Sequence, residues 1–136
     1  MFSFGIDIGG MSIKIGLVDE YGKIVEKRVI KTVTDQNLAI KNMAEQIQDI
    51  LKTQNITIKD IKGIGLGCPG AVDGSSGIID VLPNLGWENV PIVEKLNEYF
   101  NVKKGYRYRS RNCKLSCLCQ GQGHCAFRAF CRGCRR

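Results

Sequence analysis

Two short apolar runs separated by a pair of glycines constrain the start of this chain more than any other feature. Residues 2–8 are mostly apolar and carry one acid, Gly9-Gly10 interrupts them, and residues 13–18 form a second apolar run. Runs of this length bounded by glycine predict two strands joined by a tight turn. Adjacent glycines permit positive φ and remove side chains that would keep a ligand from the peptide N–H groups. The sequence therefore predicts a strand, a glycine turn with accessible backbone, and a second strand.

Three polar side chains near the glycine pair suit a phosphate and a metal ion. Asp7 stands near the end of the first predicted strand, and a phosphate-bound Mg²⁺ takes hard oxygen ligands such as a carboxylate. Ser12 adds a hydroxyl and Lys14 adds a cation. The alternative is an ordinary β-hairpin with an acid near its turn, because short glycine motifs recur by chance. Both interpretations stay open on these residues alone.

The chain joins two regions of different composition near residue 103. Residues 1–102 hold ten Lys and Arg against thirteen Asp and Glu, a net charge of −3, whereas residues 103–136 hold ten basic residues and no acid. The overall charge of +7 therefore comes from the second region. Six of the seven cysteines also lie there, and Ile and Val are absent from it. We treat 1–102 as a folded domain and 103–136 as a separate Cys/Arg-rich tail.

Length and hydropathy limit the class of protein. A chain of 136 residues suffices for one domain with a hydrophobic core. No apolar run approaches the roughly 18 residues of a membrane span. The amino terminus lacks the basic segment and apolar stretch of a secretion signal. We expect a cytoplasmic protein that has no membrane partner.

Hydrophobic periodicity gives the expected order of elements, β-β-β-α-β-(β)-α. The predicted strands are residues 2–8, 13–19, 24–33, 61–68 and 78–82, with one helix beginning after Thr34 or Asp35 and another near Pro91. Three consecutive strands predict an antiparallel meander. The strand that follows the long helix is expected to lie parallel to an earlier one. The expected fold is thus a mixed α/β sheet.

The long helix and the single tryptophan are each considered either as part of the hydrophobic core or as part of a binding site. One helix face is expected to pack on the sheet, and its apolar positions are Ile40, Met43, Ala44, Ile47, Ile50 and Leu51. A methionine in such a stripe is interpreted as core. Trp87 lies in a predicted loop over residues 83–87, where it either stacks on a sugar or caps the core.

Three stretches in order resemble one known family. They are Asp-Ile-Gly-Gly at residues 7–10 with Lys14, the glycine-rich run at residues 63–73 with Gly77, and Pro-Asn-Leu-Gly-Trp at residues 83–87 followed by Val-Pro. Over about residues 2–102 the chain resembles the ROK (repressor, open reading frame, kinase) family of sugar kinases, which has the actin-like, ribonuclease-H-like ATPase fold. The resemblance implies the amino-terminal lobe of a two-lobe kinase. Such a kinase transfers the γ-phosphate of ATP to a hexose, and glucose is the expected sugar.

The resemblance also implies roles for individual residues. In the family, the positions of Asp7, Gly9 and Gly10 form the turn that binds the phosphates and Mg²⁺. The expected ATP and Mg²⁺ site comprises Asp7, Gly9, Gly10, Ser12 and Lys14, with Asp7 as the metal ligand. Gly70 and Asn84 occupy the positions at which the family binds the sugar hydroxyls.

Two departures from the family pattern concern catalysis. Met11 stands where many members have Thr, so one hydroxyl near the phosphates is missing unless Ser12 replaces it. After Val102 the family continues with a short strand and Glu-Asn-Asp-Ala-Asn, whose Asp takes the proton from the sugar hydroxyl. Here no Asp or Glu follows Glu98, and a general base must lie within hydrogen-bond reach of its proton. We expect a truncated lobe with no catalytic residue and no useful kinase activity.

Three interpretations of residues 103–136 remain open. Their six cysteines and His124 are zinc-ligand types, yet the spacing does not give two CxxC pairs, so zinc is not expected. The basic tail also carries aromatic residues at Tyr106, Tyr108, Phe127 and Phe130, a composition that fits an RNA-binding arm. The abrupt change of composition favours the third interpretation, an out-of-frame translation. The tail would then be disordered, because it has few aliphatic residues to bury.

A second function is open within the same family. A sugar-responsive transcriptional repressor needs a helix-turn-helix region before the phosphate turn, and only five residues precede Ile6, which favours the kinase. The expected partners of the kinase are a small sugar and ATP, and nucleic acid is not expected. The resemblance implies that the full-length parent is a homo-oligomer.

Overall fold

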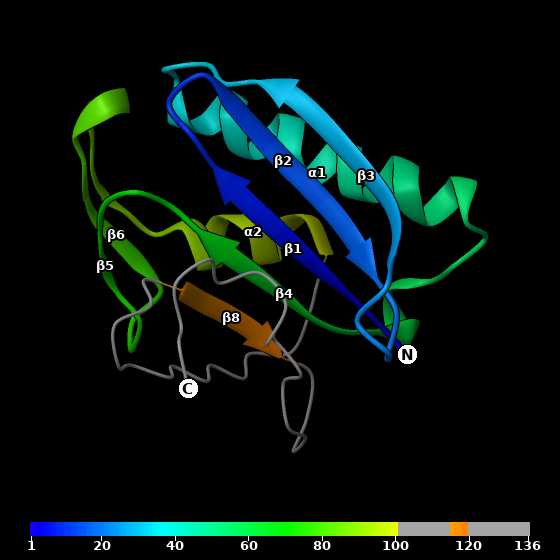
Figure 1. Cartoon of the computed structure of the whole chain (residues 1–136). Coiled ribbons are helices and arrows are strands. Elements are labelled where there is room, and N and C mark those ends of the chain that lie inside the picture. The colour runs from blue at the N-terminus through cyan, green and yellow to red at the C-terminus, as the bar shows by residue number, and fades with distance from the viewer. Residues whose placement is uncertain (101–114, 120–136) are drawn as a thin grey trace.

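A computed structural model describes residues 1–100 and 115–119 of the chain. Its main feature is a five-stranded sheet with strand order β3-β2-β1-β4-β8 (Figure 1). The strands are β1 (Phe2–Ile8), β2 (Ser12–Val18), β3 (Ile24–Lys31), β4 (Ile61–Gly67) and β8 (Leu115–Cys119). A short 3₁₀ turn, η1 (Ile58–Asp60), leads into β4.

The first three strands form the predicted antiparallel meander. Asp7 of β1 lies opposite Lys14 of β2, and Ser12 of β2 lies opposite Lys31 of β3. β4 runs parallel to β1, with Asp7 opposite Gly67. A parallel neighbour needs a crossover connection, which α1 (Gln36–Thr53) supplies between β3 and β4. The predicted mixed sheet is confirmed, with strand ends that differ by one or two residues.

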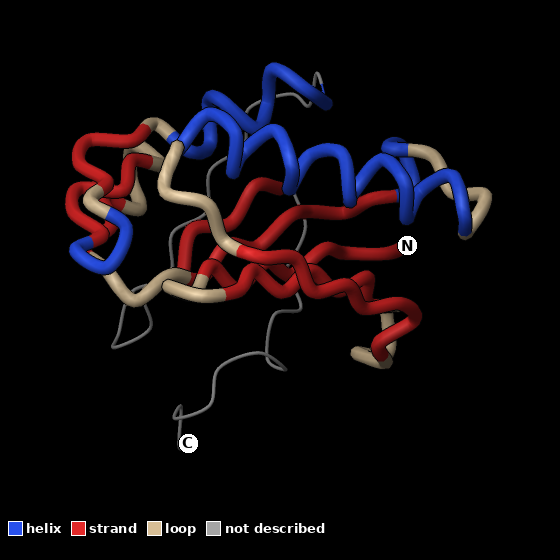
Figure 2. The backbone as a smooth tube through the Cα atoms, turned by 90° about the horizontal axis from the view of Figure 1, so that it is seen from above, coloured by secondary structure: helices blue, strands red, loops and turns tan. Residues whose placement is uncertain are grey.

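Two helices, α1 and α2 (Ile92–Phe100), cover one face of this sheet (Figure 2). The carboxylate of Asp35 accepts a hydrogen bond from the Leu38 N–H at 2.8 Å, which confirms one of the two expected N-caps. The buried positions of α1 are Ala39, Ile40, Met43, Ala44, Ile47, Ile50 and Leu51. Met43 is fully buried, so its interpretation as core is confirmed.

The sheet meets these helices with the alternate side chains of β1 and β2. Those that are at most 3% exposed are Phe4, Ile6, Ile8, Ile13, Ile15 and Leu17. Each such side chain contributes about 1.5–3 kcal/mol when it is fully buried. Because successive side chains of a strand point to opposite faces, Asp7 and Lys14 project from the face of the sheet opposite α1 and α2. The core thus fixes the direction of both charged groups.

A smaller three-stranded sheet follows β4, with strand order β5-β6-β7. Its strands are β5 (Ala71–Asp73), β6 (Ile78–Leu82) and β7 (Trp87–Val90), and the 3₁₀ turn η2 (Pro83–Leu85) joins the last two. Only β6 was expected from the sequence. Two glycines adopt a positive φ beside these elements. Gly77, at 73°, directly precedes β6, and Gly86, at 64°, directly follows η2.

Trp87 belongs to the core rather than to a sugar-stacking surface. Its side chain is 3% exposed, and its indole Nε1–H donates to the Thr34 carbonyl oxygen at 2.7 Å. A buried indole needs a hydrogen-bond acceptor, and this carbonyl satisfies it. Of the two interpretations of Trp87, the cap on the core is correct, and the predicted loop at 83–87 ends in the first residue of β7.

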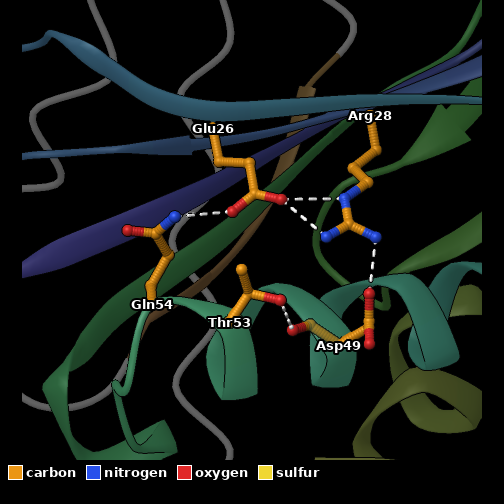
Figure 3. Close-up of polar contacts among 5 residues, drawn as sticks. All are labelled: Glu26, Arg28, Asp49, Thr53 and Gln54. Atoms are coloured by element: carbon orange, nitrogen blue, oxygen red, sulfur yellow. Dashed lines mark hydrogen bonds and ion pairs between the residues drawn. The ribbon is translucent and has the colours of Figure 1, made fainter.

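A cluster of polar side chains ties β3 to α1 (Figure 3). The Arg28 guanidinium donates to Glu26 Oε1 from Nε at 2.8 Å and to Asp49 Oδ2 from Nη1 at 2.5 Å. Gln54 Nε2 donates to Glu26 Oε2 at 2.7 Å. The hydrogen bond from Gln54, followed by that from Arg28, lowers the pKa of Glu26. β3 is an edge strand, and this cluster fixes it against the carboxyl-terminal half of α1.

One segment of the predicted disordered tail has a place in the fold. Leu115–Cys119 is a strand, β8, and it pairs antiparallel with β4. This differs from the expectation of an unstructured tail, because the free edge of a sheet can pair with any extended segment, whatever its composition. The expectations for residues 101–114 and 120–136, including those for zinc and RNA, lie outside the described residues. Among the described helices, none combines the length and apolar character needed to cross a membrane.

Candidate functional site

The turn between β1 and β2 presents backbone at one end of the sheet (Figure 1). Gly9, Gly10 and Met11 connect the strands, and the Gly9 N–H donates to the Ser12 carbonyl oxygen at 3.0 Å. Gly10 is exposed, and Met11 at the tip is 88% exposed. Within the described residues, the N–H groups of Gly10 and Met11 have no backbone acceptor. The turn therefore has N–H groups available for an anion.

Space explains the glycine at position 9, and backbone torsion explains neither glycine of the turn. Neither has a positive φ, so the expectation that the turn uses that freedom is wrong. A Cβ atom at Gly9 would lie 2.8 Å from the Ser12 carbonyl oxygen. A Cβ atom at Gly10 would lie 3.5 Å from the Asn84 Cβ atom and 3.7 Å from its Nδ2. Glycine at position 9 lets the turn close tightly, and the distances at position 10 show that Asn84 lies in van der Waals range of the turn.

Asp7 and Lys14 form an ion pair beside the turn. Lys14 Nζ lies 3.9 Å from Asp7 Oδ2, and the two side chains are 54% and 50% exposed for Asp7 and Lys14. An exposed pair at this distance contributes little to stability, about 0–1 kcal/mol. Both charges therefore remain accessible to a ligand on the face of the sheet opposite α1 and α2. Ser12 and Lys31 lie opposite each other in the neighbouring ladder, on the same face as Lys14.

The two residues implied to bind a sugar lie in different settings. Asn84 is exposed on η2, directly after β6, and it approaches Gly10 as described above. Gly70 is buried, and a Cβ atom there would lie 2.3 Å from the Val81 carbonyl oxygen and 3.0 Å from Leu82 Cδ1. The structure thus places Asn84 against the turn between β1 and β2 and Gly70 against the backbone of β6. Close packing is a sufficient reason for the glycine at position 70.

The loop after β5 is organised by one carboxylate. Asp73 accepts hydrogen bonds from the Ser75 hydroxyl at 2.6 Å, the Ser76 hydroxyl at 2.6 Å and the Ser75 N–H at 2.9 Å. These bonds, the Ser75 hydroxyl first, lower the pKa of Asp73 to about 2. Asp73 is therefore ionised at neutral pH, and its carboxylate stabilises the loop through these hydrogen bonds.

Thr32, directly after β3, makes two hydrogen bonds to the turn between β1 and β2. Its hydroxyl donates to the Gly9 carbonyl oxygen at 2.9 Å, and its N–H donates to the Met11 carbonyl oxygen at 3.0 Å. The sequence analysis missed this residue, because it placed Thr32 inside a longer third strand. In an antiparallel meander, the end of the third strand lies beside the turn between the first two strands. The predicted meander could therefore have indicated that a residue near the end of β3 contacts this turn.

Comparisons with known proteins identify the family of this chain. The sequence profile of the ROK family matches residues 3–107. The chain is 34% identical over 96 residues to a glucokinase of Halalkalibacterium halodurans, covering 69% of this chain and 29% of the glucokinase. The chain belongs to the ROK family. A family member with another role, the xylose repressor of Caldicellulosiruptor bescii, is 33% identical over 100 residues, which cover 72% of this chain and 25% of the repressor.

A solved structure of the ROK family supports the assignment of the fold. The ROK hexokinase of Thermus thermophilus superimposes with a TM-score of 0.64 and 28% sequence identity, over 74% of this chain and 33% of the hexokinase. The fold is therefore the mixed α/β sheet of the actin-like ATPases. The chain spans less than a third of the length of these two ROK kinases.

The residues of this ROK chain fit a metal ion that is held mainly by a nucleotide. Mg²⁺ commonly binds one or two protein carboxylates together with substrate phosphates and water. Asp7 supplies one half-exposed carboxylate beside available N–H groups. In the described part of the chain, no three His, Cys, Asp or Glu side chains gather as a metal site. Asp7 is therefore suited to complete the coordination of a phosphate-bound ion.

Proposed function

We propose that this chain is the lobe of an ATP-dependent hexose kinase that binds the ATP phosphates and part of the sugar, with glucose as the sugar. The observation that carries the proposal is the approach of Asn84 to Gly10. In phosphoryl transfer, the attacking hydroxyl and the γ-phosphate must come within about 3–3.5 Å. A sugar held by Asn84 beside a phosphate held at the Gly10 turn meets this requirement.

Each residue of the site has a role in the proposal. The Gly10 N–H and the Lys14 ammonium bind phosphate oxygens, and Asp7 holds Mg²⁺. When bound, Mg²⁺ neutralises the charge that develops on the transferred phosphoryl group. Asn84 donates to or accepts from a sugar hydroxyl, because its amide has both capacities. Gly70 keeps β6 close to the end of β4 and so places η2.

Calorimetry on the 136-residue chain tests the proposal. We expect ATP to bind more tightly with Mg²⁺ than without it, and Asp7→Asn to remove that difference. Lys14→Met should weaken ATP binding by up to about fivefold, the effect of an exposed ion pair. Lys59→Met is the matched control, because this exposed lysine lies in η1 before the amino end of β4, whereas the turn follows the carboxyl end of the parallel strand β1. An unmodified chain that binds no ATP would overturn the proposal.

Glucose binding tests the sugar side of the site. Asn84→Ala should weaken glucose binding and leave ATP binding close to that of the unmodified chain. Equal affinity for glucose in the variant and the unmodified chain would remove Asn84 from the site. We also propose a cytoplasmic location, because ATP and free sugar are present in the cytoplasm, and a homo-oligomeric parent protein, which the family resemblance implies.

A second candidate is a sugar-responsive repressor of the same family. The similarity to the xylose repressor of Caldicellulosiruptor bescii, at 33% identity, favours it. The two candidates differ in nucleotide binding, since a repressor that senses a sugar does not need the phosphate turn to hold ATP. Binding of xylose or glucose without any binding of ATP would favour the repressor.

A further inference from the structure

We propose that Thr32 is a positioning residue that aims the Gly10 N–H of the phosphate turn at the nucleotide. The inference rests on the proposed function and adds a residue from a third strand to the site. It starts from the two hydrogen bonds that Thr32 donates, from its hydroxyl to the Gly9 carbonyl oxygen at 2.9 Å and from its N–H to the Met11 carbonyl oxygen at 3.0 Å.

Because the peptide group is planar, a hydrogen bond that fixes a carbonyl also fixes the direction of the N–H of the next residue. In a trans peptide, the carbonyl of one residue and the N–H of the next point in opposite directions, and none of the described peptides is cis. The Gly9 carbonyl points toward Thr32, so the Gly10 N–H points away from it. The Met11 carbonyl likewise points toward Thr32, so the Ser12 N–H points away. The Ser12 N–H points across the hairpin toward β1, so the N–H that Thr32 turns to the accessible side of the turn is that of Gly10.

This arrangement also removes two unfavourable acceptors from the phosphate. A carbonyl oxygen that faced the phosphate would repel it, whereas these two carbonyls are occupied by donors of Thr32. Gly10 is exposed, and its N–H has no backbone acceptor among the described residues, so it is accessible from the side opposite Thr32. The pairing therefore prepares the turn for an anion before one binds.

The position of Thr32 is itself fixed from both directions along the chain. It follows β3 directly, and the cluster of Glu26, Arg28 and Asp49 ties β3 to α1 (Figure 3). Asp35, three residues further on, caps the start of α1. Thr32 lies between these two anchors and is half-buried. It therefore holds the turn from a rigid support.

The test compares ATP and glucose binding in hydroxyl variants of the full 136-residue chain. Thr32→Val removes the hydroxyl with little change in shape and should weaken Mg²⁺-ATP binding about two- to tenfold, the loss of one hydrogen bond. Glucose binding, which the proposed function places on Asn84, is the second readout in these variants and should not change, because Thr32 bonds only to the turn. Thr32→Ser retains the hydroxyl and should bind ATP within about twofold of the unmodified chain.

Thr53→Val is the matched control. Thr53 also donates from its hydroxyl to a main-chain carbonyl, that of Asp49 at 2.9 Å, but within α1 and away from the turn. This variant should bind ATP as the unmodified chain does. Equal ATP affinity in Thr32→Val and the unmodified chain would overturn the positioning role, as would an equal loss of glucose affinity. An unmodified chain that binds no ATP would instead overturn the proposed function, and this inference with it.

Discussion

Substitution of Gly70 with alanine tests whether close packing requires the glycine at this position. A Cβ atom at this buried position would lie 2.3 Å from the Val81 carbonyl oxygen, a backbone atom that cannot move without its strand. Normal contacts of this kind need about 1 Å more, so β6 must shift or the chain must bend at Gly70. Overpacking of this kind costs about 1–3 kcal/mol of unfolding free energy. We therefore expect Gly70→Ala to destabilise the chain by about that amount.

The measurement is urea denaturation followed by the fluorescence of Trp87, the single tryptophan, which is buried in the same small sheet. Gly67→Ala is the matched control, because a Cβ atom there would find one neighbour, the Ile6 carbonyl oxygen at an ordinary 3.8 Å. The control should be neutral or slightly stabilising, since alanine reduces the entropy of the unfolded chain. In thermal unfolding, each kcal/mol should lower Tm by about 4–8 °C. Equal stability of Gly70→Ala and Gly67→Ala would refute the packing argument.

Three further predictions follow from the core, the β5 loop and the sequence. Met43→Ala should cost about 2–5 kcal/mol of unfolding free energy, because Met43 is fully buried, whereas Leu38→Ala on the same helix, where the leucine is 46% exposed, should change it by less than about 0.5 kcal/mol in urea denaturation. The pKa of Asp73 falls on folding from about 3.8 to about 2, so its stabilising contribution is present above pH 4 and is lost between about pH 4 and pH 2. Asp73→Asn should therefore reduce the difference in stability between pH 5 and pH 2, and an unchanged difference would contradict this assignment. No Asp or Glu follows Glu98, so glucose-dependent ATP turnover by the 136-residue chain should stay at background in a coupled assay, and clear turnover would show that a base is present.

The local pattern of the sequence predicted the main sheet and its helices well. The apolar stripe that includes Met43 predicted the buried face of α1, and Asp35 was one of two expected caps. The meander and the parallel β4 followed from the order of the elements. These features depend on periodicity and on short-range hydrogen bonds, which neighbouring residues determine.

Features that depend on contacts between distant residues were not predictable in the same way. The approach of Asn84 to Gly10 joins two loops far apart in the sequence, and that of Val81 to Gly70 depends on the β5–β6 hairpin, whose first strand was not expected. The hydroxyl of Thr32 reaches a carbonyl 23 residues away. A threonine at the end of a strand gives no local sign of this bond. The sequence could propose the site residues, but only the fold brings them together.

The most direct test of the account is a pair of NMR titrations of the isotope-labelled chain. We predict that Mg²⁺-ATP shifts the backbone amide signals of Gly10 and Lys14, and that glucose shifts the side-chain amide of Asn84. Glucose should also shift the Gly10 amide, because Asn84 and Gly10 are neighbours. If neither ligand shifts these signals, or if both act only on distant residues, the assignment of a joint phosphate and sugar site at this turn is wrong.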